Sequence, residues 1–225
     1  MLVERNITEF KKYLPKEITL VAVSKTKPIA DIQEAYDTGH KIFGENKIQE
    51  MVQKYEALPK DIEWHMIGHL QRNKVKYMAH FVSLIHGVDS FKTLKEIDKQ
   101  AKKHDRIINC LLQVRIARED TKFGLTFNEI EEILNSEEFQ QLENIKVVGL
   151  MGMASFTSDN EQVTQEFKSL KTFFDKINKD KPSTFNFQLS TLSMGMSGDY
   201  QIAIENGSNM IRVGSKIFGE RNYIA

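Results

Sequence analysis

Two loops of small residues near the end of the chain have clear chemical potential. LSMGMSGD at 192–199 precedes an expected helix, and MIRVGSKIFGE at 210–220 contains an expected strand that ends in Gly-Ser. Backbone N–H groups and hydroxyls of such loops can hold a phosphate at the C-terminal face of a barrel. VAVSKTKP at 21–28 adds a lysine at the end of an early strand. Together the segments indicate a phosphorylated aldehyde held as an imine.

Lys25 is the candidate nucleophile. It ends a buried strand, and Pro28 suits the first turn of the following helix. Partial desolvation at a strand end lowers the pKa of a lysine amine and favours imine formation. The alternative is that Lys25 or Lys27 extends to solvent as an ordinary surface cation.

Arg212 is the candidate interior cation. Ile211 and Val213 share one face of the strand NMIRVG, so alternation places Arg212 on the opposite face, inside a barrel. A buried guanidinium needs an acceptor or an anion. The alternative is a structural ion pair with a carboxylate from another strand.

The two loops supply the candidate anion cradle. Ser193 and Gly195 allow close backbone approach in the first loop, and Gly214 and Ser215 offer N–H groups and a hydroxyl in the second. The alternative for the first loop is a simple helix cap, with Ser193 or Ser197 as the N-cap residue.

Other reactive residue types carry weaker signals. His65 and His69 are four residues apart, but they lie on an expected strand and loop without the glutamate of a zinc motif, so we expect no metal site. His69 follows its strand and could face the pocket. The lone Cys110 lies in the apolar run IINCLLQV, which indicates a core residue.

Short apolar runs alternate with amphipathic segments along the whole chain. This order predicts parallel strands with right-handed crossovers and favours a single (β/α)8 TIM barrel over residues 1–225, in the α/β class, over an open doubly wound sheet. The predicted strands are 19–24, 41–44, 63–68, 81–87, 106–115, 145–151, 184–190 and 209–214. The predicted helices are 4–13, 28–38, 46–57, 72–79, 90–104, 126–135, 159–179 and 197–206.

Composition restricts the class of protein. The 225 residues include 31 basic and 31 acidic side chains, so the zero net charge argues against a nucleic-acid or membrane-surface binder. The charged N-terminal segment MLVERNITEFKKYL is no signal peptide, and no apolar run is long enough for a membrane helix. One cysteine fits a reducing compartment, so we expect a cytoplasmic protein.

The motifs together resemble one family. VAVSKTKP, FGEN, HMIGHLQRNK, CLLQVRIA, GLMGMA, LSMGMSGD and RVGSKIFGE are similar to those of the YggS/PROSC family, the pyridoxal 5′-phosphate (PLP) homeostasis proteins. The resemblance runs from about residue 20 to residue 220. It implies a fold-type III barrel, like the N-terminal domain of alanine racemase, that binds PLP.

The resemblance also implies residue roles. Lys25 matches the Schiff-base lysine, and Arg212 matches the arginine that faces the pyridine nitrogen. The phosphate cradle is implied at Ser193, Gly214 and Ser215, where Ser215 replaces a threonine common in relatives, and we expect Gly195 of the first loop to bind the cofactor beside them. Pocket-lining positions are implied at Asn46 and Met151.

The implied function is vitamin B6 balance without dedicated catalysis. An arginine opposite the ring nitrogen keeps its proton, which weakens the ring as an electron sink. Racemases resembling this barrel add a C-terminal domain with a tyrosine acid/base, and we expect this chain to lack it and to be monomeric. The expected partners are PLP and apo forms of PLP-dependent enzymes. The alternatives are a minor amino-acid racemase, and a barrel for another phosphorylated metabolite.

Overall fold

The computed structural model describes residues 2–117, 123–180 and 188–220. Parallel strands in these ranges are Thr19–Val23 (β1), Ile42–Glu45 (β2), Glu63–Met66 (β3), Leu84–Val88 (β4), Ile108–Val114 (β5), Ile145–Gly152 (β6), Thr191–Ser193 (β7) and Met210–Val213 (β8). The α-helices are Leu2–Lys12 (α1), Ile29–Asp37 (α2), Ile48–Ala57 (α3), Phe91–Lys102 (α4), Phe127–Asn135 (α5), Glu137–Gln140 (α6), Asn160–Asp180 (α7), Tyr200–Glu205 (α8) and Ser215–Phe218 (α9), and Arg72–Tyr77 (η1) is a 3-10 helix.

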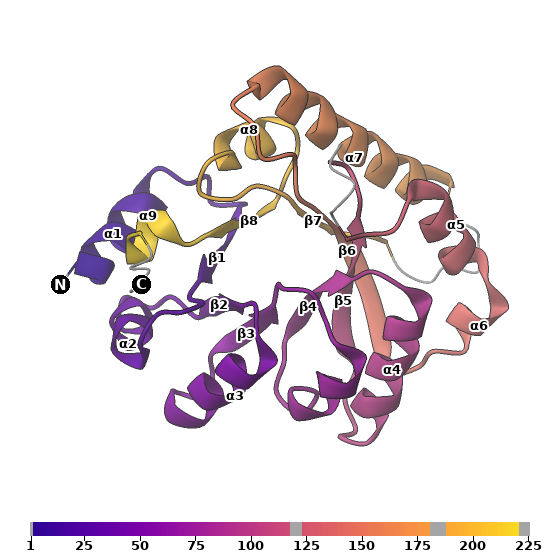
Figure 1. The fold of residues 1–225 in the computed structure, drawn as a ribbon, viewed down its shortest axis with the longest axis horizontal. Helices are drawn as coiled ribbons and strands as arrows, with labels where there is room; N and C mark the ends of the chain where they lie inside the picture. The colour runs from indigo at the N-terminus through magenta and orange to yellow at the C-terminus, as the bar shows by residue number, and fades with distance from the viewer. Residues whose placement is uncertain (1, 118–122, 181–187, 221–225) are drawn as a thin grey trace.

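The strands close into a barrel in the order of the sequence. Each strand pairs with the next, and β8 pairs with β1 in the register Thr19↔Met210 to Ala22↔Val213. Helices surround the ring of strands on the outside (Figure 1). The predicted (β/α)8 barrel is confirmed, and an open doubly wound sheet is excluded because its edge strands would not pair with each other.

Local sequence explains where several helices begin. Ser90 caps α4 by accepting a hydrogen bond from the Thr93 N–H, and Thr126 forms a reciprocal capping box with Glu129 at α5. Each helix then buries one apolar stripe against the strands, as Leu94 and Ile97 do in α4.

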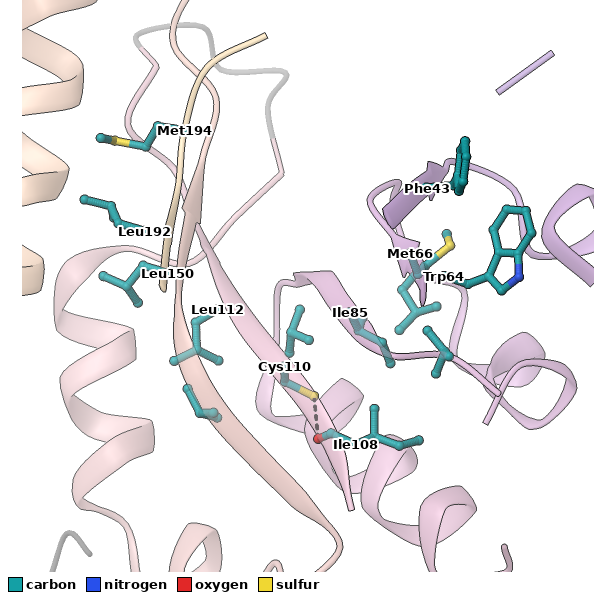
Figure 2. Close-up of a cluster of buried hydrophobic side chains, with 14 of the residues drawn as sticks. Phe43, Trp64, Met66, Ile85, Ile108, Cys110, Leu112, Leu150, Leu192 and Met194 are labelled. Atoms are coloured by element: carbon teal, nitrogen blue, oxygen red, sulfur yellow. Dashed lines mark hydrogen bonds between the residues drawn. The ribbon is translucent and has the colours of Figure 1, made fainter. Parts of the chain in front are cut away.

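The core has two layers because alternate strand residues face opposite sides. The larger layer lies between the strands and the helices and includes Phe43, Trp64 and Leu150 (Figure 2). The smaller layer fills the barrel interior with Val21, Leu84, Leu111, Met151 and Met210. These filled layers leave the loops at the strand ends as the place for a site.

Cys110 belongs to the outer layer. It lies among apolar side chains such as Ile85 and Leu112 (Figure 2). Its side chain is fully buried, and burial raises the pKa of the thiol. A buried, protonated thiol is a poor nucleophile, so the interpretation of Cys110 as a core residue is confirmed.

Strand β7 lies later than predicted. Residues 184–187 of the predicted strand are outside the described residues, and 188–190 are not strand; the strand is Thr191–Ser193. A Cβ on Gly149 of β6 would collide with the Thr191 carbonyl oxygen, so the glycine permits the close approach that sets this position. The prediction is therefore wrong for residues 188–190.

The short elements were also predicted incompletely. Helices α6 and α9 each comprise 4 residues and were not expected, while η1 is a 3-10 helix in place of the helix predicted at 72–79. Tight single turns of this kind carry no full helical period in the sequence. None of the helices in the described ranges combines the length and the hydropathy needed to traverse a bilayer.

Candidate functional site

A cavity of about 430 Å³ opens at the C-terminal ends of the strands. Lys25 and Asn46 line it just beyond β1 and β2, and Arg212, Gly214 and Ser215 line it on and beyond β8. The structure thus brings together residues that are up to 190 positions apart in the chain. Active sites of β/α barrels occupy this same face.

Three predicted site residues lie outside the cavity lining. Ser193 is fully buried beneath the cavity wall, and Met151 fills the barrel interior. Gly195 has φ +91°, and a Cβ there would meet the Ala203 Cβ at 2.7 Å, so it allows the first loop to pack on α8. These three residues therefore support the residues of the cavity lining and do not themselves line the cavity.

The lining instead includes Met153, Ser197 and Gly198. Met153 lies two positions after Met151, and Ser197 lies in the same motif as Ser193. The Ser197 hydroxyl accepts a hydrogen bond from the Gly214 N–H at 3.2 Å, which joins the two loops. Asp199, rather than either serine, is the N-cap residue of α8. The paired serines of LSMGMS were the signal that could have identified Ser197.

Arg212 is a buried cation at the floor of the cavity. Its guanidinium donates to the Ser193 carbonyl at 2.9 Å, the Ser193 hydroxyl at 2.6 Å and the Gly152 carbonyl at 3.0 Å. Among the described residues no carboxylate lies within ion-pair distance of it. Burial lowers the pKa of Arg212 to about 10, which leaves it charged at neutral pH. The alternative of a structural ion pair is therefore wrong.

Two buried histidines extend the polar contacts of Arg212. The Ser193 hydroxyl lies 3.2 Å from His86 Nδ1, and His86 Nε2 lies 3.1 Å from His65 Nδ1. Because Arg212 donates to Ser193, a consistent set of hydrogen bonds has Ser193 donating to His86 and His86 donating to His65. Burial lowers the pKa of His65 to about 3 and that of His86 well below its ordinary value. Both imidazoles are therefore neutral at pH 7.

The two lysines of the first motif have different surroundings. Both line the cavity. The Lys27 ammonium donates to the carbonyls of Phe218, Gly219 and Glu220 at 2.8, 3.2 and 3.0 Å, so it caps the C-terminal end of α9. Lys27 is thereby committed to a structural contact at the end of α9.

A buried charged cluster lies directly behind Lys25. Lys54 donates to the Ser24 carbonyl at 2.8 Å and to carboxylate oxygens of Glu45 and Glu50, both at 2.7 Å. The Ser24 hydroxyl donates to Glu45 at 2.5 Å. Burial raises the pKa of Glu45 to about 7, although Lys54 opposes that shift. The cluster joins β1, β2 and α3 beside the cavity.

The loop after β6 forms the opposite wall. The Ser155 N–H and hydroxyl both donate to the buried Glu166 carboxylate at 2.7 Å, which holds the loop against α7. Phe156 and Met196 line the cavity as well and are 97% and 38% exposed. The cavity therefore has a rigid polar floor and an apolar rim that faces solvent.

Comparison with known proteins places the chain in a family. Residues 2–222 match the profile of the alanine racemase N-terminal domain. The pyridoxal phosphate homeostasis protein of Aquifex aeolicus is 40% identical over 205 residues, covering 91% of this chain and 87% of that protein. The protein of the same name from Escherichia coli K12 is 34% identical, covering 93% and 88%.

The chain belongs to the pyridoxal phosphate homeostasis protein family.

Solved structures of family members share the fold of this chain. PipY of Synechococcus elongatus with PLP bound has 32% identity and a TM-score of 0.87, covering 96% of this chain and 100% of that one. Alanine racemase of Clostridium difficile has 15% identity and a TM-score of 0.81, covering 99% of this chain and 58% of that one. At that identity the racemase shares the fold alone.

The histidines of HMIGHLQRNK do not form a joint site in this family member. His65 points into the barrel, whereas His69 lies 3.2 Å from Asp89 and stacks on Phe123 outside the cavity lining. Within the described part of the chain no group of three or more His, Cys, Asp or Glu side chains could hold a metal ion. His69 therefore has a surface position beside the β4 and β5 loops.

Proposed function

We propose that this protein binds PLP in the cavity at the C-terminal face of the barrel and acts in PLP homeostasis. Curated relatives at 34–40% identity carry the name pyridoxal phosphate homeostasis protein, and a solved relative at 32% identity holds PLP. The protein is a PLP-binding regulator rather than an enzyme, since the racemases match only at the level of the fold.

One observation of the structure supports the ligand class most directly. Arg212 is 4% exposed, lines the cavity and has only neutral acceptors among the described residues. A guanidinium has five donors, and three hydrogen bonds to protein oxygens leave two for a ligand. Lys25 and Lys27 add positive charge against the single carboxylate of Asp199 in the lining. Such a cavity suits an anionic ligand that carries an acceptor for Arg212.

Each part of the ligand has a candidate site. Ser197, Gly198, Gly214 and Ser215 offer hydroxyls and unhindered backbone to a phosphate. Arg212 would donate to the ring nitrogen, and Asn46 and Met153 would contact the ring. We assign structural roles to Ser193, Gly195 and Met151. Ser193 holds Arg212, Gly195 lets the first loop pack on α8, and Met151 fills the barrel interior.

Lys25 is the proposed site of covalent attachment. When bound, PLP supplies an aldehyde carbon to which a lysine amine bonds with loss of water. Lys25 would provide that amine, because it follows β1 and lines the cavity. Arg212 donates a hydrogen bond but keeps its proton, so it does not make the ring nitrogen cationic. This environment favours holding the cofactor over carbanion chemistry.

We also propose the wider setting of the protein. It is a cytoplasmic monomer that consists of one PLP-binding barrel domain over residues 1–225, and its protein partners are apo forms of PLP-dependent enzymes. The buried single thiol of Cys110 and the zero net charge fit that setting. Light scattering of the purified protein measures the oligomeric state.

Mass spectrometry after borohydride reduction tests the proposal. Protein incubated with PLP and reduced should gain one pyridoxyl phosphate on the peptide that contains Lys25. Lys25→Ala should lose the covalent adduct but retain PLP binding in equilibrium dialysis, because the phosphate contacts use other residues. An adduct on another side chain, or no adduct, contradicts the assignment. Production of D-alanine from L-alanine that depends on Lys25 would favour the racemase alternative.

A further inference from the structure

The turn that carries Lys25 has a strained backbone. Thr26 has φ +65°, in the left-handed region that β-branched residues rarely adopt. The turn closes through a hydrogen bond of 3.0 Å from the Lys27 N–H to the Ser24 carbonyl. A strained backbone conformation persists only where surrounding contacts hold it. Some contact must therefore hold Thr26 in this conformation.

The Glu50 carboxylate holds the strained residue directly. Its Oε1 accepts from the Thr26 N–H at 2.6 Å and from the Lys54 ammonium at 2.7 Å. Lys54 in turn donates to the Ser24 carbonyl, at the other end of the same turn. Glu50 and Lys54 thus contact the backbone on both sides of Lys25.

Glu50 has an unusual role for its place in the helix. It lies in the first turn of α3, three residues after the N-cap Lys47, where a glutamate commonly folds back onto its own helix terminus. No side-chain hydrogen bond caps α3 at Lys47. The carboxylate instead crosses to the β1 turn, which connects the start of α3 to the reactive lysine.

We propose that Glu50 is a positioning residue for Lys25, because its carboxylate holds Thr26 in the left-handed conformation that points the lysine into the cavity. The inference deepens the proposed function and rests on the assignment of Lys25 as the attachment site. Glu50 is not among the residues that line the cavity. It should therefore control covalent attachment and leave the phosphate contacts intact.

Two variants of Glu50 distinguish the effect of losing the hydrogen-bond acceptor from the effect of changing the side chain. Glu50→Gln keeps an amide oxygen that can accept from the Thr26 N–H, whereas Glu50→Leu removes the acceptor. Glu56→Leu, on an exposed position of α3, is the matched surface control. Lys54 keeps Glu45 and the Ser24 carbonyl in all three variants, so the barrel should fold.

Binding of two ligands distinguishes positioning from general stability. PLP can form the covalent link, but pyridoxine 5′-phosphate, an alcohol with the same phosphate, cannot. In Glu50→Leu we expect PLP affinity and the initial rate of borohydride-trapped adduct to fall at least about fivefold, because the Thr26 N–H loses its acceptor. Pyridoxine 5′-phosphate affinity should change less than about twofold. Glu50→Gln and Glu56→Leu should stay near the wild type.

A readout without any ligand tests the backbone contact. The Thr26 amide should exchange with solvent deuterium faster in Glu50→Leu than in the other two variants. Adding Thr26→Gly to Glu50→Leu should restore PLP binding, because glycine adopts positive φ without strain. Equal losses for both ligands, or no loss for PLP, would overturn the positioning role. Failure of wild-type protein to attach PLP at Lys25 would instead overturn the proposed function.

Discussion

At the scale of single residues, neighbouring side chains of the same type have different tasks. Lys25 and Lys27 are two positions apart and both line the cavity, and Lys27 donates to three carbonyls at the C-terminal end of α9. Ser193 and Ser197 differ, one buried against Arg212 and the other in the lining. Burial and hydrogen-bond partners, rather than residue type, separate the two serines.

Lys27→Ala should therefore affect the fold more than covalent attachment. Loss of the three carbonyl contacts should lower the free energy of unfolding by about 1–2 kcal/mol. The borohydride-trapped adduct should remain on the peptide that contains Lys25. Urea unfolding and peptide mass spectrometry measure the two effects, and loss of the adduct in Lys27→Ala would show that Lys27 is the reactive amine.

Arg212→Glu should damage both the barrel and the ligand site. The new carboxylate would face the carbonyls of Ser193 and Gly152, which accept hydrogen bonds from Arg212 in the wild type and cannot donate one to a carboxylate. An unpaired buried charge of this kind costs about 3–5 kcal/mol of stability. Thermal unfolding should shift strongly downward, and PLP titration should weaken; an unchanged melting temperature would show that the guanidinium is not buried.

At the scale of elements, the site depends on close approach between strand ends. A Cβ on Gly68, after β3, would lie 2.4 Å from the Asn46 carbonyl oxygen, and one on Gly87 in β4 would lie 2.4 Å from the Gly68 carbonyl oxygen. Backbone atoms cannot yield as a flexible side chain can. These glycines therefore allow β2, β3 and β4 to bring their ends together at the cavity.

Gly68→Ala should displace Asn46. The collision with main-chain atoms should cost roughly 1–3 kcal/mol, as overpacking of a tight interior does. PLP affinity should fall in parallel, since Asn46 lines the cavity. Gly198→Ala is the control for stability alone, because a Cβ there meets no atom within 4 Å, although Gly198 lines the cavity. Equal stability of the two variants in urea unfolding would contradict the close approach.

At the scale of the whole molecule, buried titratable groups make the stability of the fold depend on pH. Burial lowers the pKa of His40 to about 4 and of His65 to about 3, with His86 also well below 6.5. The unfolded chain binds these protons first, so stability falls as pH drops below about 6.5. Glu45 acts oppositely: its raised pKa makes the folded state bind a proton between about 4.5 and 7, which adds stability on acidification.

The three histidines outweigh the one glutamate. Between pH 6 and pH 5 these four groups should lower the free energy of unfolding by about 3 kcal/mol, a net two protons at about 1.4 kcal/mol each. His86→Gln should reduce the pH dependence of the free energy of unfolding by the equivalent of about one proton. Urea unfolding across the pH range measures this dependence. The same dependence in the variant and the wild type would show that His86 does not contribute to it.

The sequence alone determined the fold class and the cavity's main residues. Alternating apolar and amphipathic segments specify parallel strands with crossovers, and the alternation around Arg212 correctly placed its side chain inside the barrel. Local motifs also placed Lys25, Asn46, Gly214 and Ser215 at strand ends, where the cavity lies. Local periodicity is enough for these predictions, because each depends only on residues that are close together in the sequence.

Only the tertiary structure decided which of the motif residues reach the cavity. Ser197 replaces Ser193 in the lining, Met153 replaces Met151, and β7 begins after the stretch predicted for it. These outcomes depend on contacts across the barrel, such as Gly149 with Thr191 and Arg212 with Ser193. The partners are 19 to 42 positions apart in the chain, so no local pattern could reveal them.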